Sequence, residues 1–162
     1  MRWSTIAVVV AMALPVLVLA AGQSGLMSGT APLDLGVRDG RLKAPSRNPN
    51  SVSSQVALWP GTTHRELAEI APLALRGGGP ATIARLHEIV RTMPGARVVT
   101  LRDDYLYVQF TTRWLKFVDD AEFWFDPQAG VIQLRSASRV GRRDFGVNRA
   151  RVELIRTALA AA

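Results

Sequence analysis

Cysteine is missing from this 162-residue chain, and histidine occurs only twice. Without cysteine there is no disulfide, no thiolate metal site, no cysteine nucleophile and no lipidated N-terminal cysteine. The two histidines, His64 and His87, are far apart in the sequence, and a structural zinc site needs about four such ligands. We therefore expect neither a metal nor a cofactor.

Lysine is also scarce. Lys43 and Lys116 are the only two, so arginine supplies nearly all of the net charge of +7. Arginine favours bidentate pairing with a carboxylate or phosphate, whereas lysine acts as a point charge. A basic balance permits nucleic acid, anionic lipid or an acidic partner. The same basic charge is equally expected if the genome simply favours arginine, and the charge then implies no binding role.

The first 22 residues are typical of a targeting signal. Arg2 gives a positive start, residues 6–21 are uncharged and mostly apolar, and small residues follow around Ala20 and Ala21. This layout predicts a secretory signal peptide cleaved after Ala20 or Ala21. The alternative is an uncleaved anchor, although Pro15 interrupts an apolar stretch shorter than the roughly 20 residues of a membrane span. Either interpretation predicts a periplasmic or secreted protein, membrane-anchored if the segment is retained.

Residues 23–48 are rich in Gly, Ser, Pro and Asn and show little periodicity, so we expect an extended arm or linker. Residues 49–162 are predicted to form a single domain, a size that can bury a core. Within it, Thr63 and Glu66 fit a capping box that opens a short helix. Pro80 suits the first turn of a second helix, and Asn148 is a good N-cap for the last one.

Between the second and last helices the hydrophobic period changes from about 3.6 to 2. Four strands are expected, at residues 98–101, 105–110, 113–125 and 131–139, joined by short turns. Short loops between successive strands imply an antiparallel meander. We predict an α+β fold in which a sheet of about four strands is covered on one face by two or three helices.

The acidic cluster of the third strand faces the arginine-rich fourth strand and the corner after it. Asp120 and Glu122 should lie opposite Arg135 and Arg139 on one face. Asp119 falls on the apolar face and needs a partner, because a lone buried carboxylate would cost several kcal/mol. The candidate polar cluster comprises Asp119, Asp120, Glu122, Arg135, Ser136, Ser138, Arg139, Asp144, Asn148 and Arg149.

Three interpretations of this cluster remain open. It could be a structural network of charge-assisted bonds that fixes the corner. It could bind an anion through its arginines and the helix amides near Asn148. It could also catalyse, with Asp119, Asp120 or Glu122 as acid and base and a nearby serine as nucleophile. No histidine is placed to assist, which weighs against a hydrolase or transferase, and catalytic residues cannot be assigned.

Several blocks of sequence resemble a known family. Arg-Ser-Ala-Ser-Arg-x-Gly at residues 135–141 and Gly-Val-Asn-Arg at residues 146–149 are similar to motifs of the domain of unknown function family number fourteen ninety-nine. That family occurs in bacterial envelope and thylakoid lumen proteins. Many members have cysteine at the positions of Ala44 and Ser51, a pair suited to a disulfide that this chain lacks. The resemblance implies no established reaction, cofactor or catalytic residue.

We therefore expect an exported, non-catalytic domain that binds an anionic ligand or an envelope protein through this cluster. The alternative is a carboxylate-dependent hydrolase or transferase. Export argues against nucleic acid as a partner, and contact with the membrane is expected only through the N-terminal segment. The two main hypotheses differ in geometry, because an enzyme needs an unpaired carboxylate in a solvent-open cleft.

Overall fold

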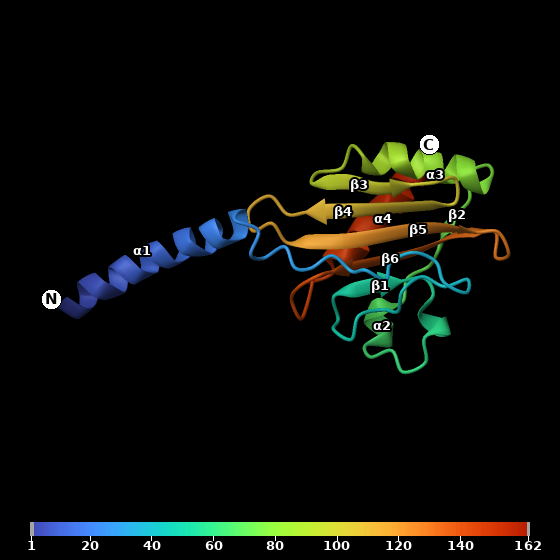
Figure 1. Cartoon of the computed structure of the whole chain (residues 1–162). Coiled ribbons are helices and arrows are strands. Elements are labelled where there is room, and N and C mark those ends of the chain that lie inside the picture. The colour runs from blue at the N-terminus through green and yellow to red at the C-terminus, as the bar shows by residue number, and fades with distance from the viewer. Residues whose placement is uncertain (1, 162) are drawn as a thin grey trace.

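The structure is a computed structural model and describes residues 2–161. Its helices are α1 (Arg2–Gln23), α2 (Arg65–Ala68), α3 (Gly79–Val90) and α4 (Val147–Ala161), with a 3-10 helix η1 (Val56–Leu58). Its strands are β1 (Ser51–Ser53), β2 (Leu73–Ala74), β3 (Ala96–Leu101), β4 (Tyr105–Thr111), β5 (Val118–Asp126) and β6 (Val131–Ser138). Figure 1 shows the helices α3 and α4 on one side of the sheet and α1 projecting away from the domain.

The sheet is antiparallel and follows the order β1-β6-β5-β4-β3, with β2 also paired to β6. The predicted α+β class and the β3–β6 meander are confirmed, but the described sheet has six strands rather than about four. The two extra strands contain three and two residues and add to the outer edge of β6 at different positions. Segments this short carry no readable alternation, so sequence periodicity could not reveal them.

The helix-covered face of the sheet holds the main hydrophobic core. Leu106, Val108, Phe123 and Leu134 point from the strands into this layer and are almost fully buried. The helices contribute the following buried residues: Ile83, Leu86 and Val90 from α3, and Val152, Ile155 and Leu159 from α4. These positions recur every three or four residues, so each helix presents one apolar stripe to the sheet.

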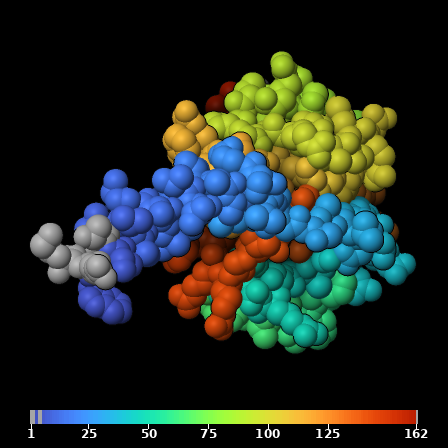
Figure 2. All heavy atoms as spheres, turned by 60° about the vertical axis from the view of Figure 1, so that its left-hand side comes forward, coloured from blue at the N-terminus to red at the C-terminus, as the bar shows by residue number. Residues whose placement is uncertain are grey.

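The other face of the sheet is covered by the segment after α1. Leu42 is 1% exposed and packs with Tyr105, Tyr107 and Trp124, whose side chains alternate with those of the helix-facing core. In Figure 2 the blue and light-blue residues after α1 cross the surface of the domain as a continuous band. The extended arm is therefore a third layer, and we call this side of the sheet the arm face.

Two predicted helix caps are wrong. Helix α2 begins at Arg65 after His64 in a left-handed conformation, and Thr63 instead donates a hydrogen bond to the carbonyl of Arg47. Helix α4 begins at Val147, so Asn148 lies inside its first turn. The carboxylate of Asp144 accepts the backbone N–H of Asn148 at 3.0 Å and takes over the capping role.

Candidate functional site

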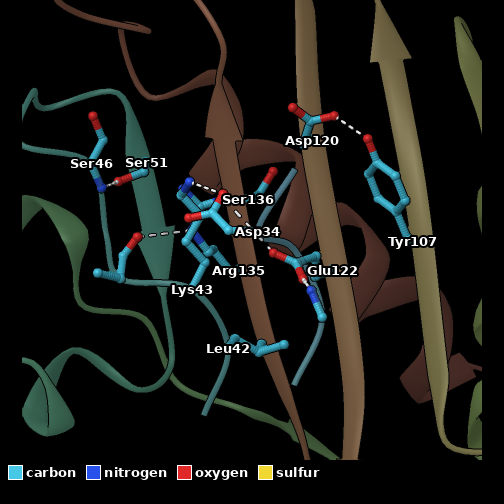
Figure 3. Close-up of polar contacts among 12 residues, drawn as sticks. Asp34, Leu42, Lys43, Ser46, Ser51, Tyr107, Asp120, Glu122, Arg135 and Ser136 are labelled. Carbon is cyan, nitrogen blue, oxygen red and sulfur yellow. Dashed lines mark hydrogen bonds and ion pairs between the residues drawn. The ribbon is translucent and has the colours of Figure 1, made fainter. Parts of the chain in front are cut away.

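On the arm face, Asp120 forms the best-matched ion pair of the predicted cluster. Its two oxygens accept bonds from Arg139 Nε at 2.8 Å and Nη2 at 2.7 Å, a bidentate arrangement. Tyr107 donates its hydroxyl to the same carboxylate at 2.5 Å, as Figure 3 shows, and accepts a bond from Gln109. The bonds to Asp120 raise the pKa of Arg139, whereas burial and then Asp120 raise the pKa of Tyr107.

Glu122 and Arg135 form a second pair on the same face with poorer geometry. Glu122 Oε1 accepts the backbone N–H of Gly36 and the hydroxyl of Tyr105, both at 2.7 Å. Its other oxygen lies 3.9 Å from Arg135 Nη1, and neither of these two buried atoms has a hydrogen-bond partner among the described residues. Burial raises the pKa of Glu122 and lowers that of Arg135 despite their mutual attraction. Each group is thus pushed towards its neutral form.

The arm closes over this second pair. Gly36 donates to Glu122, and the carbonyl of Ala44 accepts a bond from Arg135 Nε at 3.1 Å. The side chains of Glu122 and Arg135 are 0% and 5% exposed, so neither charge reaches solvent. Figure 3 shows both side chains pointing from the strands towards the arm. The buried pair therefore fastens the arm to the sheet.

On the helix face, the lone carboxylate of Asp119 has the partner that the sequence argument required. Arg151 from α4 bonds Asp119 Oδ2 at 2.6 Å, and its guanidinium lies 4.5 Å from the ring centroid of Phe110. Arg151 also donates to the side-chain oxygen of Asn148 at 2.8 Å, and that oxygen accepts the hydroxyl of Ser136. These bonds join β5, β6 and α4.

Asn148 is the centre of the corner between β6 and α4. It is fully buried, and its amide donates to Ser138 at 3.1 Å, to Asp144 at 3.0 Å and to the carbonyl of Asn50 at 3.3 Å. Because Asp144 already accepts the backbone N–H of Asn148, that helix amide is not free for an external anion. The corner is held together by its own side chains.

The predicted cluster is therefore two networks on opposite faces of the sheet. Asp120, Glu122, Arg135 and Arg139 lie on the arm face, whereas the helix face holds Asp119, Ser136, Ser138, Asp144 and Asn148. Arg149 belongs to neither, since it donates to the carbonyls of Leu67 and Glu69. The candidate set also lacked Arg151, Tyr105 and Tyr107, which bond its carboxylates. The period-2 alternation of β4 puts both tyrosines on one face, and the register of β4 with β5 brings them beside Asp120 and Glu122.

A large open cavity lies on the helix face beside Arg151. It is a groove of about 780 Å³ between the turn after α3, the end of β4 with the loop that follows it, and the first half of α4. Met93, Phe110, Val147 and Leu154 give it an apolar wall. Of the described residues, three cations line it, Arg113, Lys116 and Arg151, and no carboxylate does. Since Arg151 is already bonded to Asp119, the groove's uncommitted positive charge comes from the other two.

Within residues 2–161, no group of three or more His, Asp or Glu side chains is arranged to hold a metal ion. Pairs of carboxylate and guanidinium dominate the polar interior instead. The fold and these pairs define a class: a layered α+β domain with buried ion pairs, carried behind an apolar helix. The window Ile6–Gln23 of that helix has a mean hydropathy of 2.3 and is long enough to cross a membrane.

The chain belongs to the family described as protein of unknown function (DUF1499), whose model matches residues 41–159. The match includes the end of the arm, both networks and nearly all of α4. No curated protein and no solved structure shows a significant match.

Proposed function

We propose that this protein is an exported, envelope-associated binding domain without catalytic activity, and that α1 anchors it to the membrane. Its ligand is an anion with an apolar portion, bound in the groove beside α4. This proposal depends on one observation, the difference in exposure and charge between the buried cluster and the open groove. Asp119, Asp120 and Glu122 are buried and bonded, whereas the groove beside α4 is open and apolar with a cationic lining.

Catalysis by the cluster would need a carboxylate that can exchange protons with a substrate. Asp119, Asp120 and Glu122 are 6%, 1% and 0% exposed, and each bonds to an arginine, a tyrosine or a backbone amide. Ser136 is also fully buried, with its hydroxyl bonded to Asn148. These engaged groups favour a structural role over the hydrolase or transferase alternative.

The groove has the composition that suits an amphiphilic anion. Ligand sites are mostly apolar with a few placed polar groups, and they usually enclose about 300–1,000 Å³. The cavity of about 780 Å³ falls within that range. Arg113 and Lys116 would meet the anionic end of such a ligand, and Phe110 and Leu154 would contact its apolar part.

The anchoring part of the proposal is supported by contacts at the end of α1. Gln23 donates to the carbonyls of Arg113 and Trp114 at 3.2 and 2.6 Å. Gly22 is buried so closely against Leu115 that a Cβ there would lie 2.8 Å from the Leu115 Cα. Cleavage after Ala21 requires an accessible chain at this point, and packing of this kind favours retention of the helix.

The test uses the full chain in nanodiscs of phosphatidylcholine and dansyl-undecanoic acid as a fluorescent anionic probe. Leu154→Asp places a carboxylate in the groove wall, where Leu154 is 65% exposed. We expect it to weaken probe binding by roughly ten-fold or more, since a charge is costly on an apolar binding surface. Leu101→Asp is the matched control, because Leu101 is 47% exposed and lies outside the groove.

Equal probe binding by wild type and Leu154→Asp, after subtraction of the signal from empty discs, would contradict the groove as the binding site. Anchoring has a separate readout. Mass spectrometry of the protein from membranes should find the intact N-terminal segment, and a mature chain beginning near Ala21 would refute the anchor.

A further inference from the structure

Two loops at one end of the sheet share an unusual composition. They are the β4–β5 loop, residues 112–117, and the β6–α4 loop, residues 139–146. The pairings Thr111↔Val118 and Asp119↔Ser138 place both loops at the same end of neighbouring strands. Residues after α1 contact both of them. Ser28 donates to the carbonyl of Lys116, and Gly29 packs against the side chain of Arg139. We call them the sheet-end loops.

Both sheet-end loops expose aromatic residues, two in the first loop and one in the second. Trp114 is 61% exposed, Phe117 36% and Phe145 93%. Single exposed apolar residues are common on soluble proteins. Three aromatic residues in two loops that the same segment contacts are harder to explain by chance. Trp and Tyr concentrate at the membrane–water interface, and Trp and Phe lie on the apolar faces of segments that bind there.

Basic residues flank these aromatic side chains. They are Arg113 and Lys116 in the first loop and Arg142 and Arg143 in the second. Among residues 2–161, none of the four forms an ion pair with a carboxylate. The Arg113 guanidinium stacks 4.8 Å from the ring centroid of Trp114. Long basic side chains beside aromatic rings are suited to lie along apolar material while their charges contact headgroups.

Backbone strain occurs in the same two loops. Lys116 has φ 55° and Phe145 has φ 52°, left-handed values that are uncommon for residues other than glycine. The strained conformation at Phe145 accompanies an almost fully exposed ring. Strain of this kind persists where surrounding structure enforces it and is frequent at functional positions.

The position of α1 indicates that a membrane lies beside the loops. Figure 1 shows α1 leaving the domain at the end of the sheet where the β4–β5 loop lies. Figure 2, which brings this end forward, shows the orange-red chain after β6 beside the base of the blue helix. Gln23 and Gly22 fasten the helix to the first loop. A bilayer that holds α1 therefore lies next to both sheet-end loops.

We propose that the two sheet-end loops form a docking surface for a bilayer containing anionic phospholipids. The aromatic side chains enter the interface and the four cations contact lipid phosphates. The docking surface rests on the proposed function only in that α1 stays in the membrane, and it requires no ligand in the groove. Docking would hold the groove, which Arg113 and Lys116 also line, at the level of the headgroups.

Hydrogen exchange of the full chain in nanodiscs tests the docking surface. Discs of phosphatidylcholine alone are compared with discs that also contain phosphatidylglycerol. We expect the amides of residues 112–117 and 141–146 to exchange roughly ten-fold more slowly in the anionic discs, because cations near such a surface are strongly attracted. The β3–β4 turn at residues 102–104 lies at the opposite end of the sheet and serves as the internal control.

Two variants make the result specific. Trp114→Ala with Phe145→Ala should abolish the protection, and the amides of β5 report whether this variant remains folded. Leu101→Ala is the matched exposed control and should retain protection. Equal exchange of both loops in neutral and anionic discs would overturn the docking surface. So would protection that survives the aromatic double variant.

The docking and groove experiments can fail separately. Trp114 and Phe145 do not line the groove, so their variant should bind dansyl-undecanoic acid normally. Leu154→Asp should lose the probe and keep the lipid-dependent protection. Loss of protection by Leu154→Asp, or loss of probe by the aromatic variant, would show that the two surfaces had been wrongly separated.

Discussion

The two faces of the sheet are covered and stabilised in different ways. On the helix face the interior is mostly aliphatic with a few phenylalanines, and its buried carboxylate, Asp119, is paired with an arginine supplied by a helix. On the arm face the interior is formed by tyrosines, a tryptophan and two ion pairs, under a cover without regular secondary structure. An irregular arm offers few apolar side chains, so directional bonds hold it in place. Gly36 donates to Glu122, Ala44 accepts a bond from Arg135, and the backbone N–H of Leu42 donates to Gln55.

The arm face contains a second contrast, between its own ion pairs. Asp120 and Arg139 meet in a bidentate geometry with an added tyrosine, and Glu122 and Arg135 leave one atom each unsatisfied. The free-energy cost of desolvating two buried charges is offset only when their geometry is good and their remaining polar atoms are hydrogen-bonded. We infer that the first pair stabilises the fold and that the second serves mainly to position the arm.

The largest effect is expected from breaking the bidentate pair. Asp120→Ala leaves Arg139 buried without its counter-charge, and loss of one partner of a buried pair typically costs about 3–5 kcal/mol. Arg139→Ala should cost a similar amount, and the double variant should cost much less than the sum. Denaturant unfolding measures all three. Asp104→Ala, in the exposed pair with Arg102, is the control and should change little.

A smaller effect is expected from the second pair. Glu122→Gln with Arg135→Met removes both charges but keeps an oxygen to accept the bonds from Gly36 and Tyr105. We expect the free energy of unfolding to change by about 1 kcal/mol or less, because replacing an imperfect buried pair is often neutral. Denaturant unfolding under the same conditions provides the comparison. A loss as large as that of Asp120→Ala would contradict the distinction between the pairs.

The smallest effect concerns pH. Burial raises the pKa of Glu122 above its ordinary value of 4.5, so the folded state holds this proton more tightly than the unfolded state. Its contribution to stability is then fully present below pH 4.5 and is lost as pH rises through the folded pKa. The difference in unfolding free energy between wild type and Glu122→Gln should therefore shift against wild type as pH rises from 4.5. A difference that does not vary with pH would contradict this assignment.

Sequence periodicity was sufficient to predict the central strands and the face on which each side chain lies. The meander and the split of Asp119 from Asp120 and Glu122 follow from alternation along β5, and the need for a partner at Asp119 follows from the cost of a buried charge. The cover of the arm face did not follow, because packing of residues 35–44 depends on a single buried leucine and on backbone bonds. The open groove could not be predicted either, since it depends on how α3 and α4 meet the end of β4.

We propose that the cluster is structural and that the ligand binds in the groove instead. Asp120→Asn tests it directly, because the shape of the side chain is kept and only the charge is lost. On one preparation in nanodiscs, we predict a clear fall in the free energy of unfolding and an unchanged Kd for dansyl-undecanoic acid. Unchanged stability together with a Kd weakened by roughly ten-fold would contradict the account.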